Sequence, residues 1–175
     1  HPQHRRQRQM CIRDSISWSL GNEAGDGPTF VKGYKWIKFY DPTRIVMYER
    51  TSVHPEFKEQ KLGYYLEPHT DFLSWMYDTV EELKKTYIGK FPDRPFIWSE
   101  YSHSMGNSTG NLSENWDFIR TERQMQGGFI WDFLDQGLAA IDKDGTKYWK
   151  FGGDFAPNHY HTDGNFCLNG IVNAD

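Results

Sequence analysis

Two glutamates, far apart in the sequence, each follow a short apolar or aromatic run and precede small residues. Glu23 lies within Ser19–Gly25, and Glu100 comes directly after Trp98 and Ser99. This pattern is typical of a carboxylate that projects from the end of a buried strand. A carboxylic acid and a carboxylate that face one space can cleave a glycosidic bond. Such a pairing needs a fold that gathers strand ends, which favours a parallel α/β barrel and sugar-cleaving chemistry.

The elements between these glutamates alternate in type. Apolar runs predict strands at 16–20, 44–48, 72–76, 95–99 and 128–134. Helical spacing predicts helices at 30–40, ended by Asp41 and Pro42, and then at 78–87 and 112–125. Alternation of this kind indicates parallel βα units. After residue 135 the periodicity is lost, and Asp144-Gly145 between two apolar pairs predicts a β-hairpin.

The predicted fold class is α/β, a (β/α)₈ TIM barrel present only as a partial barrel. A complete barrel needs about 250 residues, and this chain has 175. Residues 1–14 are polar, basic and without period, so we interpret them as an unstructured or non-native leader. Residues 15–175 are predicted to form the partial barrel.

Composition limits the classes of partner. The net charge is −4, and the basic residues cluster only near the start, at Arg5, Arg6, Arg8 and Arg13. This balance does not favour nucleic acid as a partner. No apolar stretch approaches the roughly 20 residues of a membrane span. Two cysteines, Cys11 and Cys167, are too few for a disulfide framework or a zinc motif, so free thiols are expected.

Four stretches, in this order, resemble β-galactosidases of glycoside hydrolase family 2. The resemblance covers about residues 15–175, and the stretches are Trp18–Gly27, Ser99–Ser108, Gln126–Gln136 and Phe166–Val172. It implies that the chain holds about strands four to eight of the barrel. It also implies Glu23 as acid/base and Glu100 as nucleophile of a retaining enzyme that removes terminal β-D-galactose by double displacement.

The same resemblance implies supporting roles. Tyr77 contacts the nucleophile, Asn22 binds the sugar 2-hydroxyl, and His103 binds sugar hydroxyls. Trp131 forms an apolar wall under the sugar, and Asn169 is a further substrate-binding residue. Other interpretations stay open, because core packing also uses residues such as Tyr77 and Trp131, and carboxylates can hold a histidine such as His103.

Metal ions enter through the resemblance as well. It implies a Mg²⁺ site that includes Glu23, and a Na⁺ or K⁺ site that uses the backbone carbonyl of Phe166 and the side chain of Asn169. The remaining ligands lie upstream of this sequence, so both sites are expected to be incomplete. The segment 159–163 holds two histidines and an aspartate, but a solvated loop is favoured there over a metal site.

Competing functions follow from the same residues. A β-glucuronidase or β-mannosidase of the same family is the nearest alternative, and a non-catalytic carbohydrate-binding fragment is another. The isolated chain is expected to be inactive or nearly so, since an open five-strand sheet leaves an edge unpaired. The intact enzyme is expected to act on β-galactosides such as lactose, as a homo-oligomer in the cytoplasm, with the periplasm as the alternative.

Overall fold

The computed structural model describes residues 14–51, 69–155 and 160–174. These residues form two compact units, each described here by itself. The first unit takes its residues from 14–74 and 85–96, and the second from 75–84 and 97–174. Residues 1–13 of the predicted leader lie outside the described residues.

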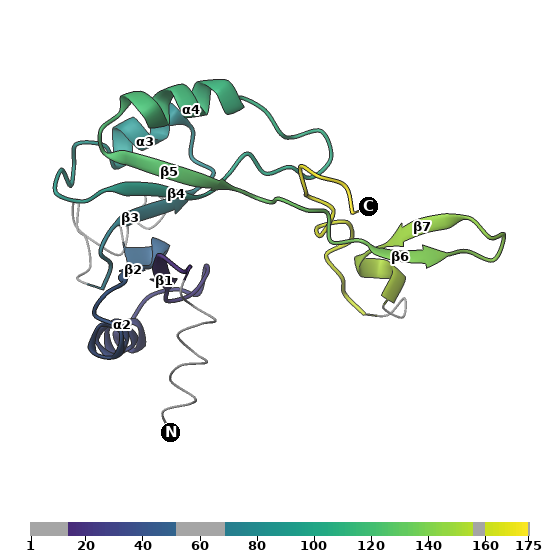
Figure 1. The fold of residues 1–175 in the computed structure, drawn as a ribbon, viewed down its shortest axis with the longest axis horizontal. Coiled ribbons are helices and arrows are strands. Elements are labelled where there is room, and N and C mark those ends of the chain that lie inside the picture. Colours follow the sequence, from purple (N-terminus) through teal and green to yellow (C-terminus); the bar gives the residue numbers. More distant parts are fainter. Residues whose placement is uncertain (1–13, 52–68, 156–159, 175) are drawn as a thin grey trace. The chain divides into compact units, whose positions relative to one another are not determined.

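Strands and helices alternate along the described chain as far as β5, and β6 and β7 follow without a helix between them (Figure 1). In order they are β1 (Ser17–Ser19), α2 (Pro28–Tyr40), β2 (Ile45–Met47), η1 (Glu49–Thr51), β3 (Leu73–Met76), α3 (Val80–Thr86), β4 (Phe96–Tyr101), α4 (Leu112–Thr121), β5 (Met125–Ile130), β6 (Leu138–Ile141), β7 (Lys147–Lys150) and η3 (Gly152–Phe155). The described residues are therefore an α/β fragment without a closed barrel.

The first unit contains one βαβ repeat. Strands β1 and β2 are parallel, with Trp18 opposite Val46, and α2 connects them. Pro28 stands in the first turn of α2, where a missing N–H costs nothing. The ring of Phe30 on this helix stacks on Tyr48 at the end of β2, with ring centroids 4.3 Å apart. This contact places the start of α2 over the carboxyl end of β2.

The second sheet has the order β3-β4-β5. Leu73 N–H donates to Pro95 O, and four residues later Tyr77 N–H donates to Glu100 O, which is the sense of a parallel pair. All four residues of β3 are buried. Helices α3 and α4 contact each other through Lys84, whose Nζ lies 5.1 Å from the ring centroid of Phe118.

Several element boundaries differ from the sequence-based prediction. Strand β4 continues to Tyr101, so Glu100 lies within the strand rather than after it. Helix α4 ends at Thr121 instead of residue 125, because Glu122 is extended and the chain turns directly into β5. Strand β5 consequently starts at Met125, three residues earlier than predicted, and stops at Ile130.

The loop-rich C-terminal part contains the predicted hairpin. Strands β6 and β7 are antiparallel, with Ala139 opposite Trp149, and Gly145 in their turn has a φ of 83°. Such a left-handed turn position favours glycine. No helix of the described residues is long and apolar enough to cross a membrane.

A partly buried carboxylate ties α2 to β2 in the first unit. Asp71 accepts hydrogen bonds from Tyr34 Oη (2.6 Å), Lys38 Nζ (2.9 Å) and the Val46 N–H (2.8 Å). Burial alone would raise the pKa of Asp71, but these three donors outweigh it and lower the pKa below its usual value. Burial, and then the bond to Asp71, raise the pKa of Tyr34 to about 12.

We expect Asp71→Asn to destabilise the protein by about 1 to 3 kcal/mol near neutral pH, since charge-assisted bonds are lost. A depressed carboxyl pKa stabilises above the unfolded-state value and stops doing so as the pH falls through the folded-state value. The difference from wild type should therefore shrink below about pH 4. Urea unfolding between pH 2.5 and 8 measures it.

Asp117→Asn is the matched control, because the side chain of Asp117 is 73% exposed. A free-energy difference for Asp71→Asn that stays constant with pH would contradict the role given to the carboxylate.

Candidate active site

The two units divide the predicted site residues between them. Asn22 and Glu23 belong to the first unit. The second unit holds the other six, namely Tyr77, Glu100, His103, Trp131, Phe166 and Asn169. Most of the predicted site can therefore be compared within one unit.

Two hydrogen bonds join Tyr77 to Glu100. Glu100 lies in β4, and Tyr77 follows the last residue of β3. The Tyr77 N–H donates to the Glu100 carbonyl at 2.9 Å, and the Tyr77 hydroxyl donates to Oε2 of the Glu100 carboxylate. Tyr77 has a left-handed φ of 56°, at the point where its backbone leaves β3. The phenol thus holds one carboxylate oxygen of Glu100.

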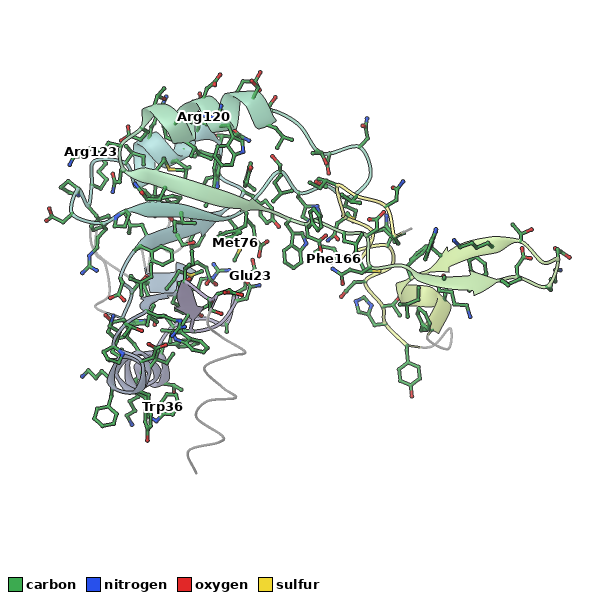
Figure 2. The ribbon with its side chains drawn as sticks, in the orientation of Figure 1. Glu23, Trp36, Met76, Arg120, Arg123 and Phe166 are labelled. Carbon is green, nitrogen blue, oxygen red and sulfur yellow. The ribbon has the colours of Figure 1, made fainter. Side chains whose placement is uncertain are left out.

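His103 lies near two aromatic rings. Its ring centroid is 5.6 Å from that of Tyr77 and 5.6 Å from that of Phe166, which Figure 2 labels. The Met105 N–H donates to His103 Nδ1 over 3.4 Å, so in the neutral ring the proton is on Nε2. An imidazole with Nε2–H is suited to donate to a hydroxyl oxygen.

Trp131 and Asn169 are anchored through their backbones. The Trp131 N–H donates to Tyr101 O at 3.2 Å, and the Trp131 carbonyl accepts from the Ser104 N–H at 2.8 Å. The Asn169 carbonyl accepts from the Asp132 N–H at 2.8 Å. These bonds place the chain after β5 beside the loop that follows β4, and they place Asn169 beside Asp132, the residue that follows Trp131.

Glu23 stands in the loop after β1 (Figure 2). Its side chain is 56% exposed, and its φ of 50° is left-handed. Its backbone N–H donates to Oε1 of Glu49 over 2.5 Å. The neighbouring Asn22 is exposed. In the first unit the Glu23 carboxylate is therefore accessible to solvent, and the hydrogen bond to Glu49 holds the backbone of Glu23.

Glu49 is a functional candidate that the sequence analysis missed. It is the first residue of η1, two positions after the last residue of β2, and only 2% of the residue is exposed. Burial raises the pKa of Glu49, although the Glu23 N–H works in the opposite direction. The signal was present in the sequence, because Glu49 ends the predicted strand at 44–48 in the same way that Glu23 and Glu100 end theirs.

Two further contacts hold the loop that carries Glu23. The Tyr48 hydroxyl donates to the Gly25 carbonyl. Nε2 of the buried His69 lies 2.9 Å from Oδ1 of Asp26. Local sequence patterns give no sign of these pairs, since the partners are more than 20 positions apart.

Comparison with known proteins identifies the family. Residues 7–175 match the family described as Glycosyl hydrolases family 2, TIM barrel domain. The chain belongs to this family.

Relatives within the family are known as β-galactosidases. The chain is 41% identical to the β-galactosidase of Priestia megaterium, an alignment that covers 96% of this chain and 16% of the relative. It is 38% identical to the β-galactosidase of Photobacterium profundum, covering 95% of this chain and 16% of the relative. The chain thus spans about 16% of the length of these relatives.

A solved structure of a β-glucuronidase from Ruminococcus gnavus, in complex with an N1-substituted uronic isofagomine, is also similar. It shares 17% identity over 69% of this chain and 25% of that chain, with a TM-score of 0.45. A likeness at this level carries no argument about the substrate.

The family resemblance implies two ion sites, and the residues of this chain suit one of them better than the other. Asn169 is 1% exposed, and neither Oδ1 nor Nδ2 has a hydrogen-bond partner among the described residues. A buried amide oxygen without a donor suits a monovalent cation. For Mg²⁺ the described residues do not suffice, since no group of three His, Cys, Asp or Glu side chains gathers in them.

The loop with two histidines is partly described. His161 and Asp163 are almost fully exposed, and their nearest polar atoms are 4.0 Å apart. His159 lies outside the described residues. Cys167 is a free thiol, as predicted.

A cavity of about 770 Å³ opens in the second unit. Tyr77 and His103 line part of it, and the rest is lined by Trp98 and Tyr101 of β4, by residues of α3 and α4, and by the loop segments before these helices. Glu100 and Trp131 are not among its lining residues. The cavity therefore adjoins two of the predicted site residues without containing the predicted nucleophile.

The close approach of β5 to β4 depends on Gly128. A Cβ at this position would lie 2.9 Å from Trp98 Cβ and 3.0 Å from Tyr101 Cδ1. We expect Gly128→Ala to destabilise the protein by about 1 to 3 kcal/mol, because β5 must move away from β4. Thermal unfolding followed by tryptophan fluorescence measures the loss.

Gly110→Ala serves as the control, since nothing lies within 4 Å of an added Cβ there. Equal unfolding temperatures for the two variants would contradict the packing described for Gly128.

Proposed function

We propose that this chain is the segment of a retaining β-galactosidase that carries both reacting carboxylates. The observation that carries the proposal is the hydrogen bond from the Tyr77 phenol to the Glu100 carboxylate at the end of a parallel strand. Such strand ends collect the catalytic groups of (β/α)₈ barrels. Support also comes from the relatives, which are β-galactosidases at 38–41% identity. The chain would supply about strands four to eight of the barrel.

In the first step Glu100 acts as the nucleophile. One of its carboxylate oxygens attacks the anomeric carbon of a terminal β-galactose, while the bond from that carbon to the aglycone oxygen breaks. Glu23 gives its proton to the departing oxygen. The product is a galactosyl ester on Glu100, and the two carboxyl groups of such an enzyme are about 5 to 5.5 Å apart.

In the second step Glu23 acts as a base. It takes a proton from water as the water oxygen attacks the anomeric carbon, and the ester bond to Glu100 breaks. Galactose leaves with its β configuration retained, and both carboxyl groups return to their starting states. The exposed side chain of Glu23 suits this role, since it must meet both the aglycone and water.

Neighbouring side chains would orient the sugar. The Tyr77 phenol holds Oε2 of Glu100, which leaves the other carboxylate oxygen for attack. The Nε2–H of His103 would donate to a sugar hydroxyl, and Asn22 would bind the 2-hydroxyl. Trp131 would form an apolar wall under the sugar, and Asn169 would be a further substrate-binding residue.

Bound cations would assist the reaction, and this chain would supply only some of their ligands. The carbonyl of Phe166 and the amide of Asn169 would hold Na⁺ or K⁺ near the sugar. Mg²⁺ beside Glu23 would need ligands from residues outside this chain. We propose that the active protein is longer than this chain and is a homo-oligomer.

The proposal predicts a covalent intermediate on Glu100. Incubating the complete enzyme that contains this segment with a 2-fluoro-galactoside carrying a good leaving group should trap the ester, because fluorine slows its hydrolysis more than its formation. Peptide mass spectrometry should find the label on Glu100. Glu100→Gln is the control and should take up none. A label on any other residue would reject the assignment.

The substrate assignment predicts a preference among sugars. The complete enzyme should hydrolyse a 4-nitrophenyl β-galactoside with kcat/KM at least about 100-fold above the matched glucuronide and mannoside, since a site built for one set of hydroxyls leaves polar groups unpaired with another. Rates measured under identical conditions decide this. Faster glucuronide or mannoside cleavage would overturn the substrate while leaving the mechanism intact.

A further inference from the structure

The loop that carries Glu23 is held by two consecutive residues at the end of β2. The buried carboxylate of Glu49 accepts the Glu23 N–H at 2.5 Å, and the Tyr48 hydroxyl donates to the Gly25 carbonyl. Both side chains are buried, with exposures of 2% for Glu49 and 0% for Tyr48. We call these two residues the β2 clamp. It grips the loop on either side of Ala24.

The clamp acts on a backbone that needs support. Glu23 has a φ of 50°, in the left-handed region that residues with a Cβ rarely occupy. Such a conformation persists where surrounding contacts determine it. The acceptor is a carboxyl oxygen that is shielded from water, where a hydrogen bond is stronger than at the surface. Glu49 therefore fixes the direction in which the Glu23 side chain leaves the backbone.

Arg50 lies near the carboxylates of both Glu23 and Glu49. Its Nη2 lies 3.7 Å from Oε1 of Glu23, and its Nε lies 3.8 Å from Oε1 of Glu49. The Arg50 side chain is partly buried, with 19% of it exposed. Consecutive residues after β2 thus contact the backbone of the loop and the carboxylate that it presents.

We infer that Glu49 is a positioning residue for the acid/base carboxylate, acting through the Glu23 N–H and supported by Tyr48. The inference rests on the acid/base role proposed above for Glu23. A carboxyl group that is misplaced by about 1 Å loses much of its advantage in proton transfer. The loss falls on proton donation to the leaving group and spares substrates whose leaving group needs no proton.

The test compares leaving groups in the complete enzyme. Glu49→Leu removes the acceptor, Glu49→Gln keeps an acceptor oxygen of similar shape, and Tyr48→Phe removes the hydroxyl while keeping the ring that stacks on Phe30. Each variant is assayed for kcat/KM with 2,4-dinitrophenyl β-galactoside, whose leaving group needs no acid, and with lactose, whose leaving group does. Both values report the step that forms the galactosyl ester.

We expect Glu49→Leu to lower kcat/KM for lactose by about 10- to 100-fold and for the dinitrophenyl substrate by less than about 3-fold. Glu49→Gln should recover most of the lactose activity. Tyr48→Phe should show the same split at smaller size. Glu114→Gln, an exposed position on α4, is the matched control and should change neither value.

Equal losses on both substrates, or no loss on either, would overturn the positioning role. If Glu49→Leu does not fold, Tyr48→Phe decides the matter by the same split. Glu23→Gln separates this inference from the proposed function. A split in Glu23→Gln with none in the Glu49 and Tyr48 variants rejects only the clamp, whereas no split in Glu23→Gln rejects the acid/base assignment itself.

Discussion

At the carboxyl end of a parallel strand the chain must turn away from the sheet. In this structure three such turns pass through non-glycine residues with a left-handed φ. Glu23, Tyr77 and Ser102 have φ values of 50°, 56° and 50°, and they follow β1, β3 and β4. Each such residue costs about 1 to 2 kcal/mol relative to a helical or extended conformation. The loops that follow, and the side chains they present, depend on contacts that offset this cost.

Those contacts come from the neighbouring strand or loop. The N–H of Glu23 meets the carboxylate after β2, and the N–H of Tyr77 meets the carbonyl of Glu100 in β4. The hydroxyl of Ser102 reaches the carbonyl of Gly110. Each of these sharp turns thus has a polar partner in a neighbouring strand or loop, and these polar groups are part of the fold.

The sequence predicted the order and type of the elements well, because periodicity and breakers such as Asp41-Pro42 are local signals. It missed the end of α4 and the start of β5, where the chain passes from helix to strand without a glycine or proline to mark the change. Glu49 was missed for a different reason. Its importance depends on a bond to Glu23, 26 positions earlier, and burial of that kind is a property of the packed fold. The roles of the site residues stay predictions.

Helix α2 has a consequence for the behaviour of this segment in solution. Trp36, Phe39 and Tyr40 are 62%, 79% and 66% exposed, and no residue of the helix is fully buried in its own unit. Three aromatic side chains on the last turns of one helix form an adhesive surface, since large exposed apolar groups favour association. We therefore expect these aromatic side chains of α2 to contribute to self-association of the segment at high concentration.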